Sequence, residues 1–381
     1  MATLITGATG YLGSYALTEL LAERSAGPFY LLTRGRDRPE QERKLWRALQ
    51  LHLDPAAFRA ALERVHFVPG DLTADGLGIP PEVRRSLPDR VTRVLHIAAS
   101  LNRRSARECT NVNLRGTLSV LTLAREIAEG RGGLDRFTFV STTAVAGDLE
   151  HRMVAEDEAV DWSRRDYDPY ARTKKLAEHM CAELLPGVSL VIVRPSAVVG
   201  DSRFAETTQF EMVRAYCFFV DLPAVPLDPR ARQELVNADF VGRAMARLHL
   251  AEAPRHRIYH LSSGASSPTA GAIGDALARA AGRSPRFVPA LQGPFRRSVD
   301  TLANGPRGRI SRLAGLLSVF LPYVTNDVVF DNRRVVDELR IEPVPFTAYC
   351  GPLYRWAKRT GFIYPYRELP TAPASRPEVA A

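Results

Sequence analysis

A tyrosine and a lysine stand four residues apart, at Tyr170 and Lys174, shortly after Asp168-Pro169. Proline is common in the first turn of a helix, so a helix is expected to begin there and to carry both side chains on one face. A neighbouring ammonium stabilises the tyrosinate and lowers a phenol pKa that starts near about 10. The pair therefore predicts a tyrosine that exchanges a proton near neutral pH. The alternative is an unrelated surface pair, because this spacing is common by chance.

Three hydroxyl side chains, Ser141, Thr142 and Thr143, come at the end of a run of strand-forming residues. A hydroxyl at the end of a strand can hydrogen-bond a carbonyl oxygen as negative charge develops on it. Serine and threonine are also common in turns, so both interpretations stay open at this point.

A glycine-rich turn stands between the first predicted strand and the first predicted helix, where residues 6–13 read Thr-Gly-Ala-Thr-Gly-Tyr-Leu-Gly. Glycine at these three positions permits a tight turn, close approach of the backbone to a pyrophosphate, and close packing of helix on strand. The N-terminus of the helix supplies N–H groups and the positive end of its dipole. A plain tight turn is the alternative to a dinucleotide site, whose predicted lining is Gly7, Thr9, Gly10, Tyr11, Leu12 and Gly13.

Arginines follow the second predicted strand, at Arg34 and Arg36. An acidic residue there would accept hydrogen bonds from the adenosine ribose and select NAD, whereas arginine offers a planar cation for a 2′-phosphate. The sequence therefore predicts NADP as the cofactor. Arg34 is the first candidate for the contact with the 2′-phosphate, and Arg36 or Lys44 is the second candidate. A solvated basic face is the alternative.

Short β-branched or aromatic runs alternate with longer segments of helical period. Strands are expected at residues 2–6, 29–33, 65–68, 91–97, 137–141, 188–194 and 257–261, and helices near 11–24, 39–64, 113–129 and 169–185. This alternation predicts an α/β fold with a doubly wound parallel sheet of the Rossmann type, whose ligand crevice opens at the carboxyl ends of the strands.

The pattern becomes less regular after residue 200. Residues 1–200 are predicted to form an NADP-binding core, joined by a strand from about residues 236–265, and residues 201–368 mainly a smaller C-terminal substrate lobe. Residues 369–381, rich in Pro and Ala, are expected to be a disordered tail.

The 381 residues are 45% hydrophobic and carry a formal net charge of +9, which excludes fibrous and mostly disordered classes and favours an anionic partner. The four cysteines are scattered, so no metal site or disulfide framework is expected and a reducing cytoplasm is the default location. The longest apolar run, near residues 313–324, is too short for a transmembrane segment. The scattered basic residues do not indicate a nucleic-acid partner.

Taken in order, these motifs resemble the extended short-chain dehydrogenase/reductases over about residues 2–262. The resemblance implies that Thr142 polarises a substrate carbonyl, with Thr143 as the alternative. It implies that Tyr170 exchanges the proton and that Lys174 binds the nicotinamide ribose and tunes the tyrosine. The other matching motifs imply further residues at the cofactor, with Asn113 as a structural support: Asp71 and Leu72 at the adenine, Ala98 and Ala99 against the cofactor, and Pro195 and Ser196.

Residues 68–79, 194–202 and 236–241 look like the thioester reductase and fatty acyl-CoA reductase branch. That branch implies NADPH-dependent reduction of an acyl thioester, carried by coenzyme A or an acyl carrier protein, to an aldehyde. A second hydride would give an alcohol, and the sequence leaves open whether that step occurs. The chain departs from the branch at residues 203–206 and 237–239, which concern the substrate site. The alternatives are a reductase, epimerase or dehydratase acting on a sugar nucleotide or another carbonyl or hydroxyl substrate, and an NADP-binding sensor without turnover.

Two apolar stretches are candidates for the wall of an acyl pocket. They are residues 313–323 and the set Phe210, Met212, Tyr216, Phe218 and Phe219. Helical core is the alternative for both, and contact with a membrane surface is a further alternative for the first. The arginines at positions 103, 104 and 107 are either a docking patch or a solvated face. The chain is expected to be a monomer or a homodimer.

Overall fold

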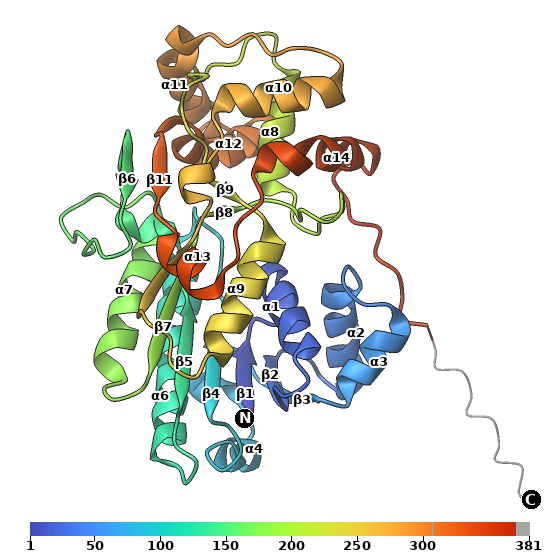
Figure 1. Cartoon of the computed structure of the whole chain (residues 1–381), viewed down its shortest axis with the longest axis vertical. Coiled ribbons are helices and arrows are strands. Elements are labelled where there is room, and N and C mark those ends of the chain that lie inside the picture. The colour runs from blue at the N-terminus through green and yellow to red at the C-terminus, as the bar shows by residue number, and fades with distance from the viewer. Residues whose placement is uncertain (307, 371–381) are drawn as a thin grey trace, which may run out of the picture.

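Seven parallel strands form the central sheet of the computed structural model, which describes residues 1–306 and 308–370 (Figure 1). The strand order is β10-β7-β5-β4-β1-β2-β3, so the chain builds outward from β1 on one side and then returns to build on the other. The strands are β1 (Thr3–Thr6), β2 (Phe29–Thr33), β3 (Val65–Pro69), β4 (Arg93–His96), β5 (Arg136–Val140), β7 (Leu190–Pro195) and β10 (Ile258–Leu261). The predicted doubly wound α/β fold is confirmed.

Helices cover both faces of the sheet, because successive side chains of a strand point to opposite sides. In β1, Ile5 packs in one apolar cluster with Leu17, whereas Leu4 packs in another with Leu121. The first face carries α1 (Tyr11–Ala22), α2 (Arg38–Leu49), α3 (Pro55–Leu62), α9 (Ala238–Leu250) and α13 (Arg333–Leu339). The second face carries α4 (Pro81–Ser86), α6 (Gly116–Glu129) and α7 (Pro169–Leu184).

The single helix predicted over residues 39–64 is wrong, because the segment forms two helices, α2 and α3. Asp54 caps the N-terminus of α3, where its side chain accepts a hydrogen bond from the Ala57 N–H, and Pro55 occupies the first turn of α3. Proline has no N–H to continue an earlier helix, so it restarts one here. The helix expected at 113–129 also begins differently, with α5 (Ala106–Cys109) leading through a π-helical turn at Thr110–Arg115 into α6.

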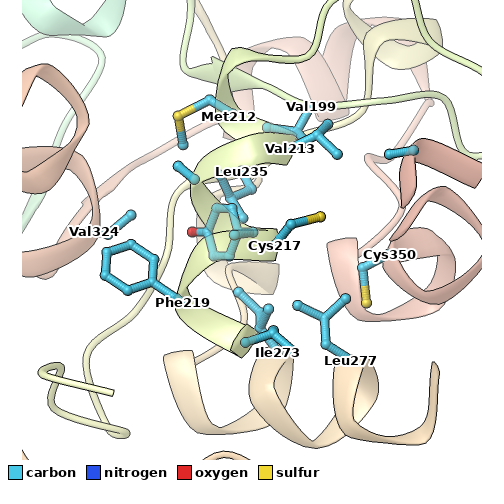
Figure 2. Close-up of a cluster of buried hydrophobic side chains, with 14 of the residues drawn as sticks. Val199, Met212, Val213, Cys217, Phe219, Leu235, Ile273, Leu277, Val324 and Cys350 are labelled. Atoms are coloured by element: carbon cyan, nitrogen blue, oxygen red, sulfur yellow. The ribbon is translucent and has the colours of Figure 1, made fainter. Parts of the chain in front are cut away.

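A second lobe stands over the carboxyl ends of the strands (Figure 1). Its helices are α8 (Glu211–Asp221), α10 (Ala270–Ala281), α11 (Gln292–Ala303), α12 (Arg309–Thr325) and α14 (Phe346–Arg359). Figure 2 shows how Val213 and Cys217 of α8, Ile273 and Leu277 of α10 and Cys350 of α14 converge in its apolar core. The lobe therefore has a core of its own, separate from the two clusters on the sheet.

Two short parallel strand pairs lie outside the central sheet. Their members are β8 (Ala197–Val198) with β9 (Leu235–Val236), and β6 (Arg152–Val154) with β11 (Val328–Phe330). Segments of two or three residues carry no periodic signal, so the sequence did not indicate them.

The segment after α14 runs back to the first lobe (Figure 1). The Trp46 Nε1–H of α2 donates to the Arg367 carbonyl at 2.8 Å, and the Arg367 N–H donates to Gln50 Oε1 at 2.7 Å. Leu369 packs against the apolar cluster of α1 and α2. Residue 369 therefore belongs to the packed chain, which corrects the expected start of the tail; residues 371–381 lie outside the described residues.

Candidate active site

A cavity of about 600 Å³ opens at the carboxyl edge of the sheet, under the second lobe. Its lining comes from the glycine turn after β1, from residues that follow β2 to β5 and β7, and from α7, α8 and α12. This is the crevice position that a doubly wound sheet predicts. The predicted site residues that line it are Gly7, Thr9, Gly10, Tyr11, Leu12, Gly13, Arg34, Asp71, Leu72, Ala98, Ala99, Thr142, Tyr170, Pro195 and Ser196.

The glycine turn is shaped by contacts that only glycine allows. Gly7 has a φ of +78°, and a Cβ there would stand 2.6 Å from the Ala98 nitrogen. A Cβ at Gly13 would stand 2.0 Å from the Gly7 carbonyl oxygen, so α1 packs directly on the turn. The backbone and the N-terminus of α1 therefore form an open cradle on the cavity wall, and this cradle fits the pyrophosphate of a dinucleotide.

Arg34 and Asp71 lie at the end of the cavity beyond β2 and β3. The Asp71 carboxylate accepts hydrogen bonds from the N–H and hydroxyl of Thr73, and these bonds hold its pKa below the usual range. Arg36 is 88% exposed, pairs with Glu40 at 3.0 Å and is not part of the cavity lining. Of the two predicted arginines, only Arg34 faces the cavity.

The Tyr170 phenol and the Thr142 hydroxyl meet in the same cavity. Asp168 caps α7 by accepting from the Ala171 N–H at 2.8 Å, and this cap places Tyr170 in the first turn of the helix. Tyr170 is 7% exposed, and burial raises the pKa of its phenol above the usual value, although the charge of Arg103 and the Thr142 hydroxyl lower it. The lowered pKa predicted from the pair of Tyr170 and Lys174 is therefore wrong, because burial outweighs the nearby positive charge. Thr142 and Thr143 both line the cavity, and Thr142 is the one whose hydroxyl lowers the pKa of Tyr170.

Lys174 lies one turn along α7 from Tyr170, but it is not part of the cavity lining. Its ammonium stands 3.9 Å from the centroid of the Phe139 ring, and the side chain is buried. Burial lowers the pKa of Lys174 from 10.5 to about 8. Its expected contact with the nicotinamide ribose stays a prediction.

Asn113 is buried beside the loop that follows β4 and does not line the cavity. Its side-chain oxygen accepts from the Ser100 N–H at 2.7 Å, and its amide donates to the Ser100 carbonyl and to Thr173. The π-helical turn presents Asn113 to this loop. These bonds join the loop that follows β4 to α7, which carries Thr173. This is the kind of structural support that the resemblance implies for Asn113.

Ser196 and Pro195 line the cavity after β7. The Ser196 hydroxyl donates to the buried carboxylate of Glu234 at 3.3 Å, and Glu234 also accepts from the N–H groups of Ser263 and Phe330. Burial raises the pKa of Glu234 to about 7. No local pattern in the sequence indicates Glu234, because its hydrogen-bond partners come from three distant segments.

The second lobe closes the cavity with few apolar side chains. Met212 at the start of α8 and Phe320 and Tyr323 of α12 line it, together with Gln209 and Leu101. The other candidates for an acyl wall belong to the core of the lobe or pack against it: Phe210, Tyr216, Phe218 and Phe219. For these four residues the helical-core alternative is correct, because α8 packs against α10, α12 and α14 in the core of the lobe.

Arg103 is turned inward and lines the cavity, so it belongs neither to a docking patch nor to a solvated face. It binds Asp168 and Tyr323, which lie 65 and 220 residues away. Sequence spacing carries no signal for such contacts.

The sheet order, the glycine cradle and the threonine–tyrosine pair define the protein as an extended short-chain dehydrogenase/reductase. Residues 5–245 match the family described as male sterility protein, an NAD-binding family, so the chain belongs to that family. Its members are NAD(P)-dependent reductases, and the chain is accordingly placed among the oxidoreductases, as predicted.

Two curated relatives match part of the chain. The nonribosomal peptide synthetase asaC of Aspergillus flavus is 27% identical over 68% of this chain and 26% of that protein. The putative fatty acyl-CoA reductase CG8306 of Drosophila melanogaster is 30% identical over 51% of this chain and 42% of that protein. The chain thus spans well under half the length of the curated relatives it matches.

Solved structures share the whole fold. The terminal R domain from the myxalamid PKS-NRPS biosynthetic pathway superposes with a TM-score of 0.80 at 24% identity, over 95% of this chain and 91% of that one. In residues 1–306 and 308–370, no helix combines the length and the apolar character needed to cross a membrane.

Proposed function

We propose that this protein reduces an acyl thioester to an aldehyde with NADPH. The observation that carries the proposal is the meeting of Thr142 and Tyr170 in the cavity that also holds the glycine cradle. The family and the fatty acyl-CoA reductase and peptide synthetase relatives support a thioester as the substrate.

The glycine cradle and Arg34 would hold NADPH, which would supply a hydride for the carbonyl carbon of the thioester. The Thr142 hydroxyl and the Tyr170 phenol donate hydrogen bonds to the carbonyl oxygen as it becomes negative, and Tyr170 then gives it a proton. The resulting hemithioacetal loses the thiol and becomes the aldehyde. One NADPH and one proton are consumed for each thioester, and one aldehyde, one thiol and one NADP⁺ are released.

Arg34 is proposed to select NADPH over NADH by binding the 2′-phosphate. Its place in the cavity supports this role, whereas Arg36 is paired with Glu40 outside the cavity. Arg34→Ala is expected to weaken NADPH binding about 10- to 100-fold, with little effect on NADH, because it removes charge-assisted hydrogen bonds. Arg36→Ala is the matched control. Equal weakening for both nucleotides would contradict the assignment.

The substrate side of the cavity is proposed to hold the acyl group against Met212, Phe320 and Leu101. A few apolar side chains beside convergent polar groups are typical of a small-molecule pocket. The net charge of +9 favours an anionic carrier of the thioester, either coenzyme A or the phosphopantetheine of an acyl carrier protein.

The test mixes the protein with NADPH and a panel of acyl-CoA and acyl-phosphopantetheine thioesters, and follows NADPH absorbance and free thiol. We expect thiol release in step with NADPH loss, and a loss of at least about 100-fold in Tyr170→Phe. Tyr30→Phe, on β2, is the matched control and keeps the activity. A hydride-to-thiol ratio of one indicates the aldehyde as product, and a ratio of two indicates the alcohol. If NADPH binds but no thioester releases thiol, the proposal fails and a sugar-nucleotide or other carbonyl substrate takes its place.

A further inference from the structure

Arg103 stands at the point where three distant segments meet. It follows β4, and its guanidinium Nη1 donates to Asp168 Oδ2 at 2.8 Å and to the Tyr323 hydroxyl at 2.5 Å. The guanidinium carbon lies 4.6 Å from the centroid of the Tyr170 ring and 5.1 Å from that of Tyr323. One side chain thus contacts the cap of α7, the reacting tyrosine and the α12 wall of the cavity.

The surroundings of Tyr170 are otherwise poor in positive charge. Burial raises the pKa of Tyr170, as do Asp168 and Cys109, whereas Arg103 and the Thr142 hydroxyl lower it. Tyr323, from α12, is itself buried and its pKa is raised. The remaining nearby cation is Lys174 on α7, whose ammonium lies over the Phe139 ring. Arg103 is therefore the cation that contacts the Tyr170 ring among the described residues.

Arginine suits this place better than lysine would. A planar guanidinium can lie against aromatic rings while its N–H groups bind a carboxylate and a hydroxyl at the same time. The Arg103 side chain is 16% exposed and Asp168 is 11% exposed, so water screens this pair weakly. The position of the charge is thus held from two sides, by α7 and by α12.

We infer that Arg103 is a positioning residue for the proposed reaction: its guanidinium, anchored by Asp168 and Tyr323, holds the Tyr170 phenol in place and keeps a positive charge against it. This inference rests on the proposed function of Tyr170 as the proton donor. It also ties the second lobe to the chemistry, because α12 supplies one of the two anchors.

The experiment is the pH dependence of NADPH oxidation in the presence of an acyl thioester, measured from pH 6 to 12 by stopped-flow pH jump so that exposure to alkali is brief. In the reductive direction the rate falls as Tyr170 loses its proton. Lys174, whose pKa is about 8, is present in every variant, so the displacement of the last alkaline fall between variants reports the phenol. Arg103→Gln removes the charge, Arg103→Lys keeps it without the planar fork, and Tyr323→Phe removes the α12 anchor but keeps the charge. Arg125→Gln, on the exposed side of α6, is the control for loss of one positive charge.

Removal of the cation weakens Tyr170 as an acid. We therefore expect Arg103→Gln to lower the rate at pH 7 about tenfold and to move the alkaline midpoint up by about one pH unit. Arg103→Lys is expected to recover at least half of that displacement. Tyr323→Phe is expected to lower the rate with a midpoint close to that of the wild type, and Arg125→Gln to change neither.

A merely structural role for Arg103 would lower the rate equally at every pH, and an unchanged midpoint in Arg103→Gln would overturn the inference. A wild-type profile without an alkaline fall above pH 9 and up to pH 12 would overturn it as well. If Arg103→Gln does not fold, Arg103→Met, which keeps an unbranched chain between the two rings, replaces it under the same criteria. Failure of the proposed function has a different signature: either the wild type oxidises no NADPH with any acyl thioester, or Tyr170→Phe retains the activity.

Discussion

At the scale of single residues, the site depends on a hydroxyl pair whose members come from different elements. Thr142 follows β5 and Tyr170 lies in the first turn of α7, and both line the cavity, where the Thr142 hydroxyl lowers the pKa of the phenol. Thr142 also caps the turn that follows it by accepting from the Ala144 N–H at 3.2 Å. One side chain therefore has both a structural and a proposed chemical part.

Thr142→Ala is expected to lower kcat about 100- to 1000-fold, because it removes one donor to the developing oxyanion. Thr143→Ala, the neighbouring and equally buried threonine, is the matched control and should lose less than about threefold. Thr142→Ser should keep most of the activity. The lost cap costs about 1 kcal/mol of stability, so unfolding is measured alongside the rates. A larger loss in Thr143→Ala would transfer the role to Thr143.

Lys174 gives a prediction about stability and pH. Its pKa is about 8 in the folded protein and starts from 10.5, so the buried ammonium destabilises the fold below pH 8, and this cost fades as the pH rises from 8 to 10.5. Lys174→Met should therefore raise the free energy of unfolding at pH 7 by up to roughly 3 kcal/mol, with the gain shrinking toward pH 10.

Urea unfolding at pH 7, 8.5 and 10 measures this gain. Lys44→Met, at a side chain that is 45% exposed, is the control and should show no such pH dependence. A gain that is the same at all three pH values would mean that the buried charge is not its cause. The same Lys174→Met variant should lose thioester reduction if Lys174 binds the cofactor ribose, which would show stability sacrificed for function.

At the scale of elements, the cradle depends on how closely α1 packs. Gly13 brings α1 against the glycine turn, and Gly242 brings α9 against α1 from the other side. Both contacts use the absence of a side chain to let two backbones approach.

Gly242→Ala is expected to destabilise the protein by roughly 1 to 3 kcal/mol. The new Cβ would stand 2.6 Å from the Tyr15 Cβ and 3.0 Å from its carbonyl carbon, so α9 and α1 must separate. Because α1 carries the cradle, NADPH affinity should fall as well. Gly293→Ala, the same change in α11 where nothing lies within 4 Å, should instead gain roughly 0.5 to 1 kcal/mol. Chemical denaturation compares the two, and equal effects would refute the packing argument.

At the scale of the whole molecule, the cavity exists because two lobes with separate cores face each other across it. Arg103, which contacts Tyr170, joins them through its bond with Tyr323 of α12. On the first lobe, the segment that follows α14 binds α2 through Trp46 and Gln50. The α2 helix packs on the first lobe, so this second contact also joins the two lobes.

Trp46→Phe should lower the free energy of unfolding by about 1 kcal/mol beyond the effect of the smaller ring, because the Arg367 carbonyl loses its donor. Trp162→Phe, at a tryptophan that is 54% exposed, is the control. Protease susceptibility at the carboxyl end of the chain should rise in the first variant only. If both variants unfold alike, the contact does not contribute to holding the lobes together.

The amino-acid sequence by itself determined the parallel sheet and the glycine cradle. It also determined that Arg34, Tyr170 and the hydroxyls after β5 would line the crevice at the edge of the sheet. These features are local: strands and helices follow from periodicity, and the cradle is a single turn between β1 and α1. Side chains that end neighbouring parallel strands must meet at one edge, so the line of predicted residues along the cavity follows from the strand order.

Only the tertiary structure decided which way the remaining side chains face. Phe210 and Phe219 are apolar, as the lining of an acyl pocket would be, but they pack into the core of the lobe. Met212, from the same segment, lines the cavity. Lys174 turns toward Phe139, and Arg103 finds its partners on α7 and α12. The physical reason is that periodicity encodes whether a residue is buried, whereas its neighbours depend on how distant segments pack, which sequence spacing does not contain.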